Sequence, residues 1–175
     1  MANDLEVIAK LEIRIGKKLL NLPRIVGIGR TNGFFMNAGG RVVELNLTGC
    51  NLTNISDLQS LTNLTVLHLG SNKLTDISAL QPLTKLTKLW LYNNRLTDTR
   101  HLQSLTMLKE LLLQNNQLTD ILALQILKQL KVLDLRNNKI KRLPTFITQW
   151  EMDIKFIKEF PIYGINLYGN PLETL

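Results

Sequence analysis

The stretch "LTVLHLGSNKLTDIS" at residues 64–78 returns as "LTKLWLYNNRLTDTR" at residues 86–100, 22 positions further along the chain. Leucines, an asparagine and a Thr-Asp pair keep their places in both copies. The residues between them change freely, as His68 against Trp90 shows. Self-similarity at a fixed short period is typical of repeat architectures. The fixed columns therefore predict a shared core, and the free columns predict a surface that faces water.

The full pattern L-x-x-L-x-L-x-x-N-x-L occurs five times without a gap, and a sixth copy arrives ten residues late. Within each copy, L-x-L alternates with a period of two, as a short strand does. The stretch "TDISALQPLTK" behind one strand spaces Ile77, Leu80 and Leu83 three residues apart, which predicts a 3₁₀ turn or irregular helix. Each copy is thus expected to form one coil, and stacking of the coils buries the leucines.

The asparagine column of the repeat is expected to point inward. Its amides can there satisfy backbone groups of the turn and of the neighbouring coil. The first position holds a cysteine, a small substitute that an outermost coil tolerates. The column consists of Cys50, Asn72, Asn94, Asn116, Asn138 and Asn170.

These repeats resemble the leucine-rich repeats, specifically the 22-residue internalin-like class of bacteria with its phrase "LTDISxLxxLTNL". The resemblance covers residues 42–175, and five copies in strict phase make it specific. It implies an α/β fold, a right-handed solenoid or horseshoe with a parallel sheet on its concave face and short 3₁₀ or irregular convex segments. We expect five regular repeats in residues 42–151 and an insertion with a divergent last repeat in residues 152–175.

Residues 1–41 are expected to cover the first coil, whose leucines and strand edge would otherwise be exposed. Asn3 and Glu6 form a capping-box signature ahead of an apolar stripe at helical spacing. The run "GFFMNAGGRVVELNL" at 33–47 then predicts a hairpin. A helix-plus-hairpin cap is favoured over a membrane anchor, because Glu6 and Glu12 interrupt the basic side of the helix. The stripe consists of Leu5, Ile8, Leu11, Ile15, Leu19 and Leu22.

The C-terminal end departs from the period. Leu143 and Pro144 begin a convex segment, and ten inserted residues then delay the last copy. One interpretation is a longer convex helix whose aromatic residues cover the last coils. The other is a junction, because "GINLYGNPLE" at 164–173 resembles the last repeat of bacterial leucine-rich arms that precede a Ras-like GTPase in Roco-type multidomain proteins. The apolar residues of the insertion include Trp150, Phe156, Ile157 and Phe160.

The net charge of +7 is spread along the chain: residues 1–41 contribute +4 (seven basic, three acidic), residues 42–143 contribute +5 (twelve against seven), and residues 144–175 contribute −2 (two against four). A protein that tracks phosphates needs several cations on one face, so this scatter disfavours nucleic acid as a partner. The single cysteine, Cys50, excludes an intramolecular disulfide and fits a reducing compartment, so we expect a cytoplasmic protein. The N-terminal segment is expected to be neither a signal peptide nor a membrane span.

Motifs that carry catalysis, such as a P-loop, H-E-x-x-H or C-x-x-C, are absent from the sequence. Cys50 and His68 fall in adjacent coils, but their columns point to opposite sides of the strand, which excludes a nucleophile–base dyad. Asp76, Asp98 and Asp120 form a column that is too thin for calcium and suits the capping of convex turns. We therefore expect no enzyme activity, no cofactor and no metal.

Aromatic and apolar side chains gather in the free strand columns, inside a rim of charges. Such a composition is typical of a protein-binding patch. The sequence therefore predicts an interaction module, a monomer or weak oligomer, whose solvent-exposed concave face binds an unidentified protein. The alternative is the regulatory arm of a larger Roco-type signalling GTPase. The expected contact residues are His68, Lys88, Trp90, Tyr92, Glu110, Leu112, Gln114, Asp134, Arg136 and Tyr168.

Overall fold

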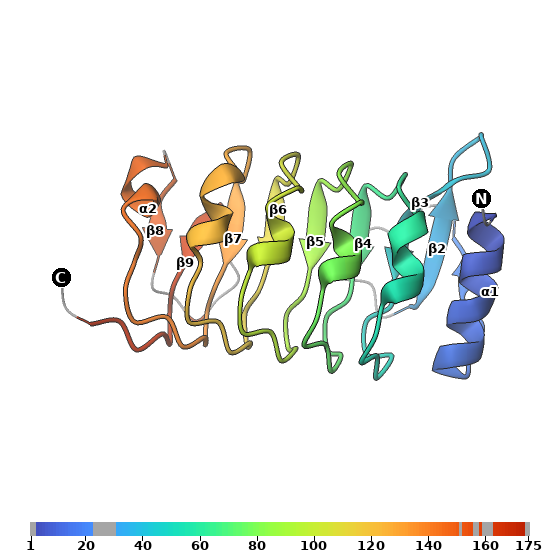
Figure 1. Cartoon of the computed structure of the whole chain (residues 1–175), viewed down its shortest axis with the longest axis horizontal. Helices are drawn as coiled ribbons and strands as arrows, with labels where there is room; N and C mark the ends of the chain where they lie inside the picture. The colour runs from blue at the N-terminus through green and yellow to red at the C-terminus, as the bar shows by residue number, and fades with distance from the viewer. Residues whose placement is uncertain (1–2, 23–30, 151, 156–157, 159–162, 174–175) are drawn as a thin grey trace.

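A computed structural model describes residues 3–22, 31–150, 152–155, 158 and 163–173 of the chain. Within these residues, nine strands form one sheet in the order β1-β2-β3-β4-β5-β6-β7-β9-β8. Figure 1 shows the strands side by side along the length of the molecule. The strands are β1 (Leu20–Asn21), β2 (Gly33–Met36), β3 (Val42–Asn46), β4 (Val66–His68), β5 (Lys88–Trp90), β6 (Glu110–Leu112), β7 (Val132–Asp134), β8 (Ile154–Lys155) and β9 (Gly164–Asn166).

Short turns cover one face of this sheet, and the opposite face is called the concave face below. Each strand from β3 to β6 is followed by a 3₁₀ turn, and β7 is followed by one turn of α-helix. The strand and the convex turn predicted for each coil are thereby confirmed. The turns are η1 (Ser56–Ser60), η2 (Ser78–Leu80), η3 (Arg100–Leu102), η4 (Leu122–Ile126) and the helix α2 (Phe146–Gln149).

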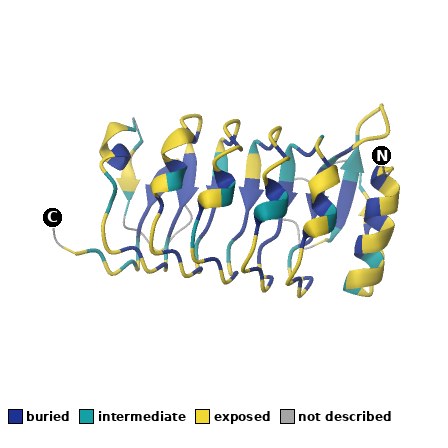
Figure 2. Ribbon diagram, in the orientation of Figure 1, coloured by how far each residue is buried: buried dark blue, intermediate teal, exposed yellow. Residues whose placement is uncertain are grey.

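Leucines fill the space between the sheet and the convex turns. Leu67, Leu89 and Leu111, which occupy one strand position in three successive coils, are each 0% exposed. The strands are therefore largely dark blue in Figure 2, whereas the convex turns also show yellow. Parallel pairing one coil apart repeats this arrangement along the solenoid, so the same residue type meets the same environment every 22 positions.

The asparagine column lies inside the turns that follow the strands. Asn94 accepts the amide hydrogen of Leu74 at 3.0 Å and donates to the carbonyl oxygens of Leu69 and Leu91, each at 3.0 Å. Asn72, Asn116, Asn138 and Asn170 make the corresponding bonds in their coils. Cys50, in the first coil, makes a 3.8 Å contact from its sulfur to the carbonyl of Thr48 in place of these amide bonds. Each amide thus joins its own turn to the preceding coil.

The N-terminal cap consists of helix α1 (Asp4–Ile15) and the hairpin of β2 and β3. The side chain of Asn3 caps the helix by accepting the amide hydrogen of Leu5 at 3.2 Å. Asp4, the first residue of the helix, is buried. Its carboxylate accepts the amide hydrogen of Val42 at 2.8 Å and pairs with Arg41 at 2.9 Å. This buried carboxylate therefore fastens the helix to the start of the first coil.

The predicted apolar stripe of α1 is only partly correct. Ile8 and Leu11 are buried as expected, but Leu5 is 45% exposed and Val7 is buried in its stead. The buried side of the helix consists of Asp4, Val7, Ile8 and Leu11, so it begins in the first turn but at Asp4 instead of Leu5. Among the described residues, no helix is long and apolar enough to cross a membrane.

In the described residues, the longer convex helix of the first interpretation is not formed. Helix α2 ends at Gln149, Trp150 is extended, and the chain then enters strand β8. That strand pairs in parallel with β9 at the outer edge of the sheet, so β9 lies between β7 and β8. A side chain on Gly164 would lie 2.4 Å from the carbonyl oxygen of Asp153, which explains why glycine begins β9. The residues Phe156, Ile157 and Phe160 lie outside the described part of the chain.

Candidate functional site

The parallel register brings equivalent strand positions of successive coils together on the concave face. His68 lies opposite Trp90, Trp90 opposite Leu112, and Leu112 opposite Asp134. The column continues from Asp134 to Asn166. The columns predicted from the repeat are therefore neighbours in space.

The expectation that the centre of this face is exposed to water is wrong. Trp90 is 4% exposed, Leu112 1% and His68 2%. Trp90, Leu112 and Val132 form a hydrophobic cluster of their own, apart from the leucine core, and Tyr92 packs against it. Strands about 4.8 Å apart bring large side chains of one column into contact, so each covers its neighbours. Trp90 is thus buried although its register is correct.

The ring of Trp90 is held from two sides. The imidazole of His68 stacks on it, with ring centroids 3.6 Å apart and an interplanar angle of 8°. Its indole Nε1 donates to Oε1 of Glu110 at 2.6 Å, and the other carboxylate oxygen pairs with Nζ of Lys88 at 3.3 Å. The Lys88 side chain is 50% exposed, whereas that of Glu110 is 17% exposed. The chain of contacts therefore runs from a buried ring to a cation at the surface.

A second charged group lies toward the C-terminal end of the face. Asp134 is 0% exposed and accepts from Nη2 of Arg136 at 2.6 Å and from its Nε at 2.9 Å. Nη1 of Arg136 also donates to the carbonyl of Lys158. The ammonium of Lys158 lies 5.9 Å from the ring centroid of Tyr168, within the range of a cation–π contact. Burial of Asp134 is compensated by this two-point ion pair.

Tyr92 owes its position to a glycine in the preceding coil. A Cβ atom added at Gly70 would lie 2.3 Å from the Tyr92 ring, so the ring lies directly over the bare backbone of β4's coil. The sequence analysis did not use this feature, although a glycine in a column of large side chains was visible as a signal. Gln114 continues the column, half-buried, with an Oε1 atom that has no hydrogen-bond partner among the described residues.

Burial shifts the pKa of one side chain on the concave face and of one in the asparagine column. Burial, with the Lys88 cation adding to it, lowers the pKa of His68 to about 4, so the imidazole is neutral at pH 7. Burial also raises the pKa of the Cys50 thiol, against the opposing effect of Lys17. Within the described residues, no group of His, Cys, Asp or Glu side chains is arranged to hold a metal ion.

The aspartate column caps the convex turns. Asp76 accepts the amide hydrogen of Ser78 at 2.8 Å, and Asp98 accepts that of Arg100 at 3.0 Å. Asp120 and Asn54 make the same bond in their coils. Hydrogen bonds from Ser78 hold the pKa of Asp76 below its usual value. The capping interpretation is therefore confirmed, because each carboxylate is used by its own coil.

A stack of coils with a parallel sheet and inward asparagines defines a leucine-rich-repeat solenoid, as the resemblance implied. The family model described as "Leucine Rich repeats (2 copies)" matches residues 41–82, 62–104 and 106–148. These matches span more than half of the chain, so the protein belongs to the leucine-rich repeat family. Folds of this family are non-catalytic interaction scaffolds. No curated protein matches the chain.

Solved structures show the same fold. Internalin C2 of Listeria monocytogenes is 33% identical over 63% of this chain and 48% of its own, with a TM-score of 0.61. Internalin F of the same organism is 30% identical over 71% of this chain and 34% of its own, with a TM-score of 0.61. The chain thus spans about half the length of the internalin C2 chain and about a third of the internalin F chain. The ectodomain of the Arabidopsis thaliana receptor kinase SOBIR1 is 22% identical over 98% and 95% of the two chains, with a TM-score of 0.69, and shares the fold.

Proposed function

We propose that the protein binds another protein through the concave face of its sheet. The observation that carries this proposal is the connected set of contacts from Trp90 through Glu110 to Lys88. Side chains that are already held in place lose little conformational entropy on binding, which leaves more of the contact energy for affinity. The set lies at the middle of the sheet, where a partner would contact coils on both sides.

The ten predicted contact residues divide into two layers. His68, Trp90, Leu112 and Asp134 are buried and act as the supporting layer. The other members are exposed or half-buried, and we assign direct contact with the partner to them. This contact layer consists of Lys88, Tyr92, Glu110, Gln114, Arg136 and Tyr168.

A paired capture experiment tests the proposal. The protein and its double variant Lys88→Ala/Gln114→Ala are used as bait in an extract of the source organism, and the captured proteins are quantified. One partner should be lost about tenfold from the concave variant, as expected when contacts at the centre of an interface are truncated. The control is Gln81→Ala, an exposed convex position, which should capture as the parent does. A partner retained equally by both variants would place recognition on another face.

The regulatory-arm alternative rests on the last repeat. The phrase "GINLYGNPLE" forms strand β9 and the turn in which Asn170 donates to the carbonyl of Leu135 at 2.9 Å. Asn170 makes the same backbone hydrogen bonds as the asparagines of the earlier coils, so the last coil could end a leucine-rich arm that continues into another domain. A P-loop motif encoded downstream of Leu175 would establish a GTPase of the Roco type.

We further propose a cytoplasmic protein of bacterial origin that acts as a monomer or weak oligomer without nucleic acid. Support comes from the lone Cys50, which is buried and free, and from the scattered charge. A salt titration against duplex DNA tests the last point. Log affinity that falls steeply with log salt would contradict it.

A further inference from the structure

A groove of about 860 Å³ lies at the edge of the solenoid where the strands begin. One wall is lined by residues 125, 126 and 128–131, which lead into β7. The other is lined by Phe146 and Gln149 of α2 and by Trp150 and Met152 after it. Phe146 is buried and its ring centroid lies 5.0 Å from that of Trp150, which is half-buried. The groove forms where the insertion takes the chain away from the regular path of a coil.

The rim of the groove is cationic. Lys109, Lys128 and Lys131 line it and are exposed, and none of them pairs with a carboxylate among the residues the structure describes. The described lining residues include no aspartate or glutamate. These three ammonium groups therefore offer charge that the described part of the chain does not neutralise.

In the earlier coils, the residues at the positions of Lys109 and Lys131 are hydrogen-bonded within the solenoid. The positions equivalent to Lys109 and Lys131 are Thr65 and Thr87. Their hydroxyls donate to the carbonyl oxygens of Val43 and Thr65, at 3.0 and 3.1 Å. In the described part of this column, exposed lysines replace the bonded hydroxyls only beside the groove.

Apolar surface accompanies the cations. Ile126 is 51% exposed, and Trp150 and Met152 are half-buried, all three lining the groove. An exposed apolar side chain next to unpaired cations is complementary to a ligand that combines an apolar group with negative charge. A free carboxylate or phosphate alone would leave the apolar wall uncovered.

We propose that this groove binds a segment of a partner protein in which one aromatic or large aliphatic side chain is flanked by carboxylates. The apolar side chain lies against Trp150 and Ile126, and the carboxylates pair with Lys109, Lys128 and Lys131. The surface is distinct from the concave face, so this proposal does not depend on the function proposed above.

Two tryptophans separate the two surfaces experimentally. Trp90 and Trp150 are the tryptophans of the sequence, so an ¹⁵N-labelled protein gives two indole signals, one for each surface. Titration with the acetylated and amidated peptide Glu-Glu-Phe-Glu-Glu should shift the Trp150 signal and leave that of Trp90 in place. Replacing the phenylalanine of the peptide by alanine should abolish the shift. A shift of Trp90 alone, no shift, or equal binding of the alanine peptide would overturn the proposal.

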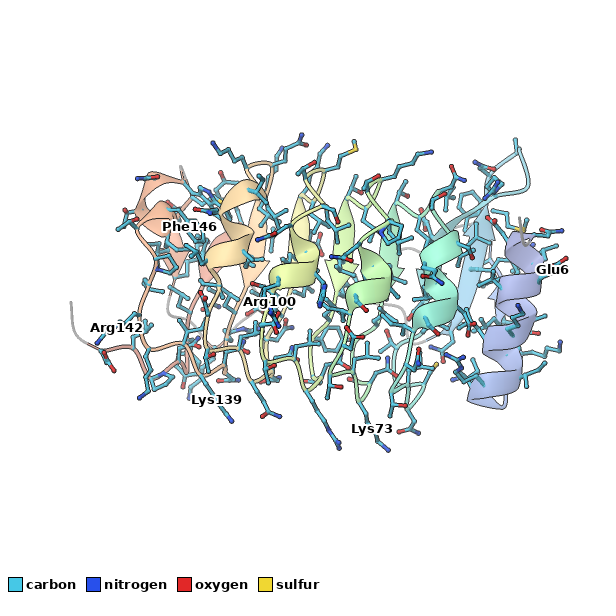
Figure 3. The ribbon with its side chains drawn as sticks, viewed as in Figure 1. Glu6, Lys73, Arg100, Lys139, Arg142 and Phe146 are labelled. Carbon is cyan, nitrogen blue, oxygen red and sulfur yellow. The ribbon has the colours of Figure 1, made fainter. Side chains whose placement is uncertain are left out.

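A charge-matched pair of variants tests the cations. Lys128→Gln/Lys131→Gln should weaken the peptide about fivefold at low salt, in keeping with modest gains from exposed ion pairs. The control Lys73→Gln/Lys139→Gln removes the same charge from the edge where strands end. Figure 3 shows Lys73 and Lys139 extending from that edge, away from Phe146. Equal weakening by both pairs would reduce the effect to net charge and refute the groove.

Discussion

The interior of the solenoid and the middle column of its concave face are both buried, but only the interior repeats. Inside, one leucine or asparagine is copied from coil to coil, as Leu67 and Leu89 or Asn72 and Asn94 show. On the concave face, each coil contributes a different residue, and His68, Trp90, Leu112 and Asp134 are nevertheless nearly inaccessible. A repeated residue therefore indicates a repeated environment, whereas a variable column does not indicate exposure.

The two regions achieve burial by different means. Each interior leucine meets the same neighbours, so its packing is set by the geometry of stacking alone. On the concave face, burial depends on individual pairs, such as the stack of His68 on Trp90 and the seat of Tyr92 over Gly70. The interior packing can therefore be repeated in every coil, whereas the concave cluster depends on the particular residues that its coils carry.

Trp90→Ala is expected to break the concave cluster with the largest effect. It removes a ring that is 4% exposed, leaves His68 without its stack and Glu110 without the indole hydrogen bond. Truncation of a buried tryptophan costs about 3–5 kcal/mol of unfolding free energy, measurable by denaturant titration. The control is Gln81→Ala on the convex side, expected within about 0.5 kcal/mol of the parent. A Trp90 variant as stable as this control would show that the face adds nothing to folding.

The sequence predicted those features that recur from coil to coil. Strands, 3₁₀ turns, the inward asparagines and the capping aspartates follow from the 22-residue period and elementary geometry. It failed where one coil differs from the next. The burial of Trp90 depends on which side chain lies in the adjacent strand, and strand β8 depends on pairing with β9, which follows it in the chain.

One regular feature was also missed, although the sequence displays it. An additional asparagine precedes the inward one in three coils. These additional residues are Asn93, Asn115 and Asn137, and their φ angles are 52°, 57° and 53°. Their exposed side chains are linked by hydrogen bonds: Asn115 donates to Asn93 at 2.6 Å, and Asn137 donates to Asn115 at 2.8 Å. Asparagine tolerates this left-handed conformation better than other residues with side chains, which explains its recurrence.

A pH titration would sharpen the comparison, because it reports on the concave cluster without removing a side chain. His68 titrates at about 4 in the folded protein against 6.5 in the unfolded chain. Between these values only the unfolded state takes up the proton, so stability falls as pH drops from 6.5 to 4. The total loss corresponds to about 3 kcal/mol.

The matched variant is His68→Phe, which keeps a ring on Trp90 but does not titrate. Carboxylates are shared by both proteins, so the difference in unfolding free energy between them isolates the imidazole. That difference should change steadily between pH 6.5 and pH 4 and stay level above pH 7. A constant difference across the whole range would mean that His68 is accessible to water and the stack is loose.

Asn94→Leu tests the interior with the smallest of the three effects. Asn94 is 7% exposed, and its amide satisfies the amide hydrogen of Leu74 and the carbonyls of Leu69 and Leu91. Leucine is more apolar, yet it leaves these backbone groups unpaired, which costs about 1–3 kcal/mol. The neighbouring Asn93→Gly is the control, because Asn93 is exposed and glycine accepts its φ of 52° without strain.

Chemical denaturation of the two variants shows whether hydrogen bonds or leucine packing make the repeated asparagine important for stability. If inward asparagines are held by hydrogen bonds, Asn94→Leu lowers the unfolding free energy and Asn93→Gly stays within about 0.5 kcal/mol. Equal, small effects would mean that leucine packing alone determines the stability of a coil. The asparagine would then serve only to select the turn, and the interior would depend on apolar contact rather than on the pairing of its buried polar groups.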